Sequence, residues 1–281
     1  MVTGAQGMLG TDAVTRLRAD GHDVTEHTRQ SLDLSDVDAV VAAVRGHDVV
    51  WNCAAWTAVD DAETEEDAAL AVNGVAPGIL AAAAAEAGAR LVQISTDYVF
   101  AGDATEPYAE DAPTDPRSAY GRTKQVGERA VRAGLPDAHL IVRTAWLYGA
   151  HGGCFPKTIA RVAAERGGVA VVDDQVGQPT WTRDVADLVV RLVDAEAPAG
   201  TYHATSSGQT SWFDFARRVV AAAGLDPEIV TPTDSAAFPR PAPRPAYSVL
   251  GHAALERVGV TPIGDWADRW DQASVEVLGL A

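Results

Sequence analysis

Tyr120 and Lys124 lie four residues apart in the segment Tyr-Gly-Arg-Thr-Lys. In a helix, this spacing places the phenol and the ammonium on one face. An ammonium beside a phenol favours the phenolate and lowers a pKa that starts at about 10. The pair therefore predicts a tyrosine that exchanges a proton near neutral pH. A chance pairing is the alternative, but lysine is scarce: Lys124 and Lys157 are the only two in the chain.

Ser95 and Thr96 supply hydroxyl groups at the end of an expected strand. Ligands of open parallel sheets bind at the carboxyl edge of the strands. We therefore expect Ser95-Thr96 to place a hydroxyl group at this edge of the sheet.

Gly4, Gly7 and Gly10 follow the first expected strand with the spacing G-x-x-G-x-x-G. Glycines let the backbone turn sharply and approach a pyrophosphate, while the start of the next helix supplies unpaired N–H groups. A merely tight strand-to-helix turn is the alternative. The position directly after the first strand favours a dinucleotide site.

Two features bear on the adenosine half of such a cofactor. Arg29 can pair with a 2′-phosphate, and Asp33 and Leu34 can contact adenine. No Asp lies at the tip of the second expected strand, and Glu26 is the nearest acid. These residues favour NADPH, with NADH as the alternative, although a solvated surface charge would also explain Arg29.

The elements that must position these residues alternate between strands and helices. Such alternation predicts an α/β fold with a doubly wound parallel sheet of the Rossmann type. Expected strands cover residues 1–3, 22–26, 48–53, 91–95 and 140–144. Expected helices cover residues 9–19, 37–44 with Ser35 as cap, 79–87 stopped by Gly88, and 115–133 beginning at Asp115-Pro116.

Beyond residue 149 the periodicity weakens and Gly and Pro cluster. We predict a dinucleotide-binding domain at 1–149 and a smaller, mixed, mainly substrate-binding lobe at 150–281. One helix near 183–193 has the apolar pattern of an element that returns to the sheet. The proline-rich stretch 238–245 is expected to be an extended loop.

Composition excludes several classes of partner. The 22 basic and 39 acidic residues give a net charge of −17, which repels nucleic acid. No apolar run approaches the roughly 20 residues of a membrane span, and no secretory signal is present, so no membrane association is expected. Cys53 and Cys154 have no metal-ligand spacing and are interpreted as reduced thiols of a cytoplasmic protein. No metal site is predicted.

Taken together, the motifs resemble the extended short-chain dehydrogenase/reductase family, and within it the dTDP-4-dehydrorhamnose reductases. The resemblance runs nearly end to end. It rests on the glycine turn, on the Tyr120 to Lys124 pattern and on Ser-Thr-Asp-Tyr-Val-Phe at 95–100. Further matches are 52–60, Asn73, 143–148, 175–180 and 244–248.

The resemblance implies transfer of a hydride from a nicotinamide to the C4 ketone of a dTDP-linked 6-deoxyhexose, and a homodimer. Tyr120 would protonate the oxygen, Thr96 would hydrogen-bond it, and Lys124 would hold the ribose and tune Tyr120. The expected substrate site comprises Thr96, Asp97, Tyr98, Trp146, Gln178 and Arg244. The expected cofactor site comprises Gly4, Gln6, Gly7, Met8, Leu9, Gly10, Arg29, Asp33, Leu34, Ala54, Ala55, Trp56, Asn73, Ser95, Tyr120 and Lys124.

Several alternatives stay open. A dehydratase of this superfamily carries Asp-Glu after its Thr, whereas this chain has Asp97-Tyr98. An epimerase uses the same Tyr and Lys but consumes no cofactor. Other antibiotic-type deoxysugar ketoreductases, such as the dihydrostreptose type, and a non-catalytic nucleotide-binding regulatory subunit complete the set.

Four smaller expectations concern side chains outside the catalytic pattern. Trp146 and Trp181 are candidates for a sugar or base pocket, whereas Trp212, Trp266 and Trp270 are expected in the core. Arg244 is read either as a ligand of the substrate diphosphate or as an exposed loop arginine. The acidic run 60–67 is interpreted as a solvated helix start. His151 and His203 are assigned no chemistry.

Overall fold

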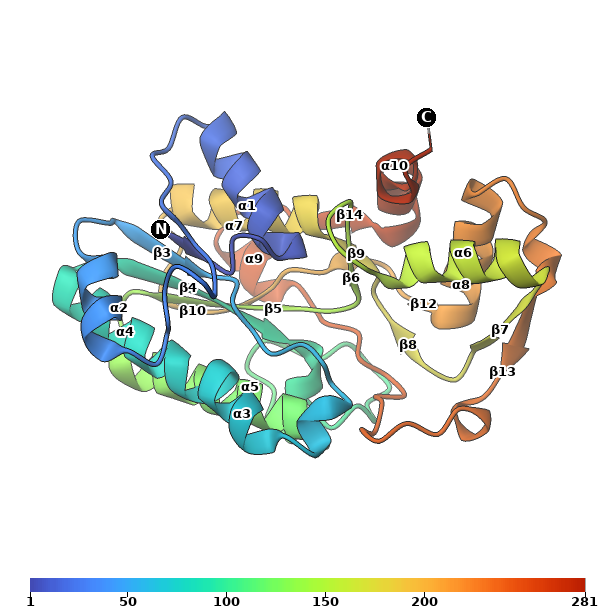
Figure 1. Cartoon of the computed structure of the whole chain (residues 1–281), viewed down its shortest axis with the longest axis horizontal. Helices are drawn as coiled ribbons and strands as arrows, with labels where there is room; N and C mark the ends of the chain where they lie inside the picture. The colour runs from blue at the N-terminus through green and yellow to red at the C-terminus, as the bar shows by residue number, and fades with distance from the viewer. Residues whose placement is uncertain (281) are drawn as a thin grey trace.

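A six-stranded parallel sheet forms the centre of the larger part of the molecule, in a computed structural model that describes residues 1–280 (Figure 1). Its strand order is β10-β5-β4-β3-β1-β2, and each neighbouring pair is parallel. This is the predicted doubly wound Rossmann arrangement. The strands are β1 (Val2–Thr3), β2 (Glu26–His27), β3 (Val49–Asn52), β4 (Arg90–Thr96), β5 (His139–Thr144) and β10 (Gly200–His203).

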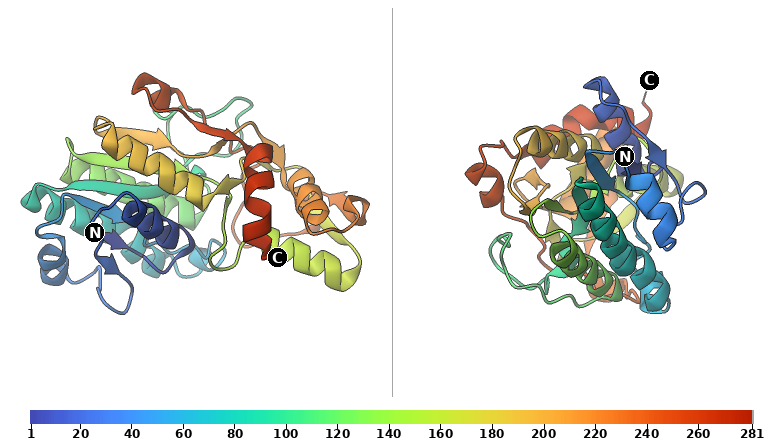
Figure 2. Two further views of the ribbon diagram at one scale, coloured as in Figure 1. Left: turned by 90° about the horizontal axis from the view of Figure 1, so that it is seen from above. Right: turned by 90° about the vertical axis from the view of Figure 1, so that its left-hand side faces the viewer.

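Helices cover both faces of this sheet (Figures 1 and 2). On one face α1 (Met8–Ala19), α7 (Thr182–Asp194) and α9 (Ala253–Arg257) bury apolar side chains in a common core. On the other face α2 (Val37–Val44), α4 (Ala76–Ala87) and α5 (Ala119–Gly134) form a second core. The strands between them are buried on both faces, which explains their continuous apolar runs.

The alanine-rich helix is longer than predicted. The 3-10 turn η1 (Asp61–Glu63) precedes α3 (Glu66–Leu70), and the π-helical turn η2 (Ala71–Val75) joins α3 to α4. The result is one stretch of 22 residues, Glu66–Ala87, which Gly88 ends in the left-handed conformation at φ 69°. By length and composition alone this stretch could cross a membrane, which corrects the expectation that no such run exists. Half of its most apolar 18-residue segment is buried inside the fold, as in the core helix of a globular domain.

Three local predictions in this part are wrong at their boundaries. The second strand covers only Glu26–His27 rather than 22–26. Asp36, not Ser35, caps α2 by accepting from the Ala39 amide, because Ser35 is bonded to Asp33. Helix α5 begins after the Ser118 cap, which accepts from the Gly121 amide, and not at Asp115-Pro116.

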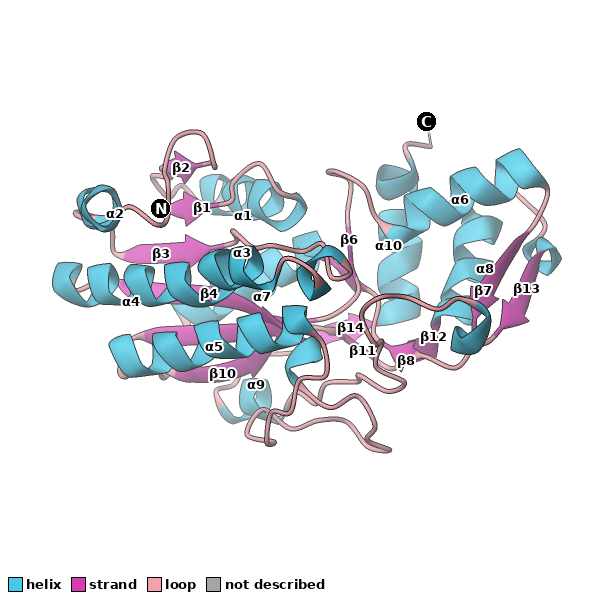
Figure 3. Ribbon diagram, turned by 60° about the horizontal axis from the view of Figure 1, so that its bottom comes forward, coloured by secondary structure: helices cyan, strands magenta, loops and turns pink. Residues whose placement is uncertain are grey.

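A second lobe lies beyond the carboxyl ends of the sheet strands (Figure 3). Its core joins α6 (Phe155–Arg166), α8 (Trp212–Ala222) and α10 (Trp266–Leu278) around Phe215 and Trp270. Short strands and turns complete it. These are β6 (Leu147–Tyr148), β7 (Val169–Val172), β8 (Val176–Gly177), β9 (Thr180–Trp181), β11 (Ser206–Ser207), β12 (Thr210–Ser211), η4 (Pro227–Ile229), β13 (Val230–Thr233), η5 (Ser235–Ala237) and β14 (Ile263–Asp265).

The chain returns from the second half to the sheet twice. The predicted returning helix is present as α7 and packs beside α1. The edge strand β10 pairs with β5 and was not predicted, because its Gly-Thr-Tyr-His sequence carries no strong strand pattern. A short η3 turn (Asp97–Val99) follows β4, and the Thr96 side chain caps it by accepting from the Tyr98 amide.

Candidate active site

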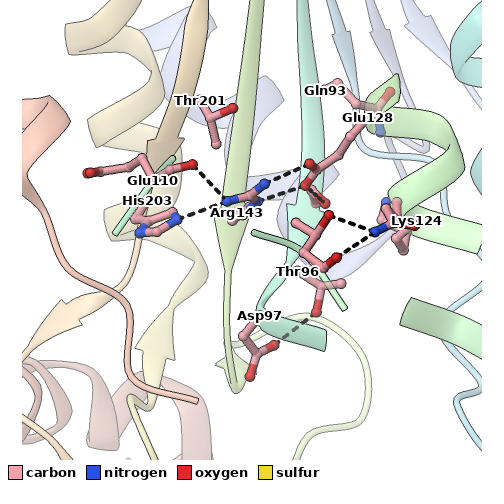
Figure 4. A network of polar contacts seen from close by, with 12 residues as sticks. Gln93, Thr96, Asp97, Glu110, Lys124, Glu128, Arg143, Thr201 and His203 are labelled. Carbon is pink, nitrogen blue, oxygen red and sulfur yellow. Dashed lines mark hydrogen bonds and ion pairs between the residues drawn. The ribbon is translucent and has the colours of Figure 1, made fainter. Parts of the chain in front are cut away.

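The three predicted catalytic side chains meet at the carboxyl end of β4. Thr96 is the last residue of that strand, and Tyr120 and Lys124 project from α5 beside it. The Lys124 ammonium donates a hydrogen bond of 2.6 Å to the carbonyl oxygen of Ile94 (Figure 4). The Tyr120 ring packs edge-on against Tyr98, with ring centroids 5.6 Å apart. The expected cluster of hydroxyl, phenol and ammonium is therefore present.

The acidity of Tyr120 differs from the prediction. Burial raises the pKa of its phenol to about 12, and the neighbouring Thr96 hydroxyl only partly offsets this. Lys124 does not lower the Tyr120 pKa here, because its ammonium is directed to the strand carbonyl. The phenol is therefore held in its protonated form at neutral pH.

Lys124 is almost completely buried, and burial lowers the pKa of its ammonium to about 8. Glu128, one turn further along α5, acts in the opposite direction and favours the charged form. Burial would raise the pKa of the Glu128 carboxyl, but hydrogen bonds from Arg143 and Ser95 lower it. The ammonium therefore faces a carboxylate on its own helix.

Glu128 is the centre of a buried polar network that the sequence analysis missed (Figure 4). Its two oxygens accept two hydrogen bonds of 2.8 Å from the Arg143 guanidinium. One oxygen also accepts from the Ser95 hydroxyl at 2.7 Å, and the other from Arg132 at 2.9 Å. Ser95 thus ties β4 to α5.

Asp97 is buried next to Thr96. Its Oδ1 accepts a hydrogen bond of 2.9 Å from the Thr96 hydroxyl. Burial raises the pKa of the carboxyl to about 6, although the hydroxyls of Ser248 and Thr96 favour the ionised form. Asp97 and Tyr98 thus adjoin Thr96 and Tyr120.

The glycine turn has the geometry of a phosphate cradle. A Cβ at Gly4 would lie 2.6 Å from the Ala54 amide nitrogen, and one at Gly10 would lie 2.1 Å from the Gly4 carbonyl oxygen. At Gly7, the N-cap of α1, only the Gly4 carbonyl oxygen lies nearby, at 3.2 Å, and no side chain caps the helix. The first amides of α1 are therefore available to a phosphate.

The residues around this turn divide into core and surface. Leu9 is buried in the core under α1, so only its backbone can reach a cofactor, and Gln6 is exposed. Arg29 follows β2 on the surface, close enough to Asp33 to favour that carboxylate. Asp33 accepts from both the amide and the hydroxyl of Ser35, so it shapes the turn before α2, and Leu34 packs against the core beside it.

The loop after β3 is held by Asn73. The Asn73 side chain accepts from the Trp56 amide at 2.9 Å and donates to the Trp56 carbonyl at 3.1 Å. Its amide nitrogen also donates to Thr123 at 3.2 Å. Asn73 lies in a π-helical turn, a feature frequent at functional sites. It positions the backbone of Trp56, while the Asn52 side chain accepts from the Ala54 amide at 3.1 Å.

Trp146 lies on the side of the second lobe and has an unusual backbone conformation. Its φ is 47°, in the left-handed region, and its ring stacks on Trp212 with centroids 3.5 Å apart. Such strain in a non-glycine residue persists only where the surroundings impose it. Trp212 is half-buried and packs against the core of the second lobe. Trp181, by contrast, is buried with Trp270 and does not line a pocket.

Two predicted substrate residues are engaged elsewhere. Gln178 is buried, and its side chain bonds both the amide and the carbonyl of Leu250, at 2.8 and 3.2 Å. The Leu250 backbone therefore holds the Gln178 side chain in place. Arg244 forms an ion pair of 2.9 Å with Asp60, so it is not a free loop arginine.

The acidic run is not merely solvated, because three of its members bind other elements. Asp60 binds Arg244, Glu63 accepts from the Ala119 amide at the start of α5 at 2.8 Å, and Glu66 pairs with Arg122 at 2.7 Å.

Other groups in the molecule carry less chemistry. Within residues 1–280, no group of three or more His, Cys, Asp or Glu side chains is arranged to hold a metal ion. His203 joins the network around Arg143, and burial lowers its pKa to about 3. Cys53 and Cys154 are free thiols. A hollow of about 750 Å³ lies beside β10, lined in part by Arg132 and Arg257, and does not reach the catalytic cluster.

Comparison with known proteins gives concordant results. A family model described as the RmlD substrate binding domain matches residues 1–277. A dTDP-4-dehydrorhamnose reductase of Streptomyces griseus is 51% identical, over 100% of this chain and 94% of its own. A probable dTDP-4,6-dihydroxy-2-methyloxan-3-one 4-ketoreductase of Streptomyces antibioticus is 48% identical, over 99% of this chain and 95% of its own length. The crystal structure of a dTDP-4-dehydrorhamnose reductase from Bacillus anthracis in complex with NADP is similar, with a TM-score of 0.94, 35% identity and 98% of both chains covered.

Proposed function

We propose, from the premise that this chain belongs to the RmlD substrate-binding domain family of dTDP-4-dehydrorhamnose reductases, that it reduces the C4 ketone of a dTDP-4-keto-6-deoxy-L-hexose with NADPH. The preferred reaction converts dTDP-4-dehydro-L-rhamnose to dTDP-L-rhamnose. The observation that carries the proposal is the meeting of Thr96, Tyr120 and Lys124 at the sheet edge that the glycine turn also faces.

NADPH, when bound, supplies the hydride for the ketone carbon. The glycine turn and the first amides of α1 would hold its pyrophosphate. Arg29, exposed after β2, is the residue assigned to a 2′-phosphate. Glu26, the nearest acid, forms an ion pair of 2.6 Å with Arg18. NADPH is therefore favoured over NADH.

Tyr120 is assigned the proton that the ketone oxygen receives. A proton donor must be protonated when the substrate arrives, and burial maintains that state of the phenol. Thr96 is assigned a hydrogen bond to the same oxygen, for which its hydroxyl proton must turn away from Asp97 Oδ1. Lys124, held against the Ile94 carbonyl, is assigned a contact with the cofactor ribose.

The sugar would lie between the catalytic cluster and the second lobe. Asp97 and Tyr98 border it from the strand side, and the Trp146 ring forms an apolar wall opposite. A flat aromatic face suits a deoxysugar, which presents C–H groups to it. Gln178 is assigned a structural role instead.

A second candidate substrate is another 4-keto-6-deoxy sugar of the antibiotic type. It is favoured by the 48% identity to the Streptomyces antibioticus ketoreductase, which is close to the 51% identity to the Streptomyces griseus reductase. Since both sugars would receive their proton from Tyr120, the shape of the pocket around Trp146 would determine which sugar is preferred.

The decisive experiment is NADPH oxidation by the purified chain with dTDP-4-dehydro-L-rhamnose and with its C3 and C5 epimers, repeated with NADH. One mole of NADPH consumed per mole of ketone reduced supports the reductase. An epimerase would interconvert the sugars without consuming NADPH. No turnover of any ketone would contradict the proposal and would favour the alternative of a non-catalytic, nucleotide-binding regulatory subunit.

We also propose a cytoplasmic homodimer that binds neither nucleic acid nor membrane. The two free cysteines and the net charge of −17 support the location and the lack of a nucleic-acid partner. Light scattering of the purified chain tests the oligomeric state.

A further inference from the structure

Asp60 joins the sheet domain to a proline-rich segment that returns from the second lobe. We call residues 238–245 the strap. Asp60 Oδ2 accepts from Nε and Nη2 of Arg240 at 3.0 and 2.7 Å. Its Oδ1 lies 2.9 Å from Nη2 of Arg244 and accepts from the Ala242 amide at 3.2 Å. One carboxylate thus binds three groups of the strap, about 180 residues away in the chain.

The strap lies next to the catalytic cluster. In Figure 1 the chain that leaves β13 runs back from the second lobe towards the side of α3. Arg244 lines a small hollow of about 40 Å³ together with Tyr98 and Ser118. Tyr98 in turn packs against Tyr120. The guanidinium of Arg244 is therefore one aromatic ring away from the proposed proton donor.

The charges in this contact do not balance. Two guanidinium groups share a single carboxylate, because Arg240 and Arg244 both pair with Asp60. Burial would raise the Asp60 pKa, but the hydrogen bonds from Arg240 and the strap amide lower it, so the carboxyl is ionised at neutral pH. A diphosphate offers more oxygens and more negative charge than a carboxylate, and guanidinium groups bind phosphate oxygens in pairs. The same two arginines are therefore a better match for a diphosphate than for Asp60.

We propose that Asp60 and the diphosphate of the nucleotide sugar compete for Arg240 and Arg244, and that substrate binding exchanges one anion for the other. This inference rests on the proposed function, because the nucleoside diphosphate is the handle of that substrate. In this inference Asp60 is a positioning residue for Arg240 and Arg244. The carboxylate holds the strap arginines at the sugar site and is displaced when the diphosphate binds to them.

The test is the affinity of purified variants for dTDP, measured by titration calorimetry without turnover. Asp60→Asn removes the competing charge and keeps the side-chain shape, so we expect dTDP to bind about fivefold more tightly. Asp61→Asn, next in the chain and exposed, removes the same charge from a side chain without an arginine partner among the described residues, and should leave the affinity unchanged. Asp60→Glu retains the charge and should show no gain. Arg244→Gln added to Asp60→Asn should abolish the gain.

Two controls separate the outcomes. NADP⁺ binding should be the same in the Asp60→Asn variant and the wild type, because the pyrophosphate of the cofactor is assigned to the glycine turn. If NADP⁺ tightens as much as dTDP, the exchange site is not specific to the substrate and the inference is wrong. Unchanged or weaker dTDP binding by Asp60→Asn in a chain that reduces the ketone would also overturn it. Tighter dTDP binding in a chain without reductase activity would count against the proposed function alone.

Discussion

The ammonium of Lys124 donates its hydrogen bond to the backbone carbonyl of Ile94, at 2.6 Å, rather than to the phenol one turn earlier on the same helix. The lysine is thus fixed to β4, the strand that ends in Thr96. The relative positions of the Lys124 ammonium, the Thr96 hydroxyl and the Tyr120 phenol are therefore set by β4 and α5 alone. A site built on such rigid elements is held more accurately than one built on loops.

Tyr120→Phe removes the proposed proton donor and leaves the ring in place. We expect turnover with NADPH and the 4-keto sugar to fall by about two to four orders of magnitude, while NADPH still binds. Steady-state kinetics and cofactor fluorescence measure the two effects. Tyr202→Phe, whose hydroxyl only donates to the Pro198 carbonyl at the edge of the sheet, is the matched control. Near-normal turnover in Tyr120→Phe would refute the role of Tyr120.

Lys124 makes the stability of the chain depend on pH in a defined direction. Its pKa is about 8 in the folded chain, below the 10.5 of an exposed lysine. Between these values the unfolded chain binds more protons, so the free energy of unfolding rises with pH. Relative to Lys124→Met, the wild type should gain about 2 kcal/mol between pH 8 and pH 10.

Urea unfolding at a series of pH values measures that difference, with Lys157→Met as the control for loss of a lysine. A flat difference between wild type and Lys124→Met across this window would show that the ammonium is not desolvated in the folded chain.

Much of the sheet domain could be predicted from local signals. Glycines at the first turn, the alanine tract with its Gly88 stop and the apolar runs each specify an element without reference to the rest of the chain. The start of α5 was mispredicted because Ser118 and Asp115-Pro116 are both good helix starts, and only the packed structure selects between them. The strand β10 depends on its pairing with β5, which its own sequence does not reveal.

The candidate site was predictable where spacing along one element suffices, as for Tyr120 and Lys124. The hydrogen-bond partners of Ser95, Gln178 and Arg244 could not be predicted, because each is set by a contact between distant segments. The position of Glu128, in contrast, could have been predicted from the sequence. Glu128 follows Lys124 by the same four-residue step, so the helix face that carries the chemistry continues to it.

Glu128→Gln should destabilise the fold strongly. The variant leaves the buried Arg143 guanidinium without its bidentate carboxylate, and breaking a buried ion pair from one side costs about 3–5 kcal/mol. Urea unfolding gives the free energy of unfolding. The double variant Glu128→Gln/Arg143→Gln should recover part of the loss, because neither charge is then left alone.

Glu276→Gln is the control for that experiment, since Glu276 pairs with Arg183 on the surface and its loss should change stability by less than about 1 kcal/mol. Equal losses in Glu128→Gln and Glu276→Gln would mean that the buried network does not hold β4 to α5.

Gly177→Ala tests the aromatic wall of the sugar site. A Cβ at Gly177 would lie 2.5 to 2.8 Å from the Trp146 indole, so the ring must shift from its present position, in which it stacks on Trp212. If the sugar is bound by that ring, a loss of about 1–3 kcal/mol of sugar binding would lower kcat/KM by about five- to 150-fold. Because the catalytic cluster is untouched, we expect the loss mainly in KM, with NADPH affinity retained. Gly153→Ala, where a Cβ meets nothing within 4 Å, should leave kcat/KM unchanged. A fall in kcat at constant KM would instead mean that Trp146 positions the reacting ketone rather than binding the sugar.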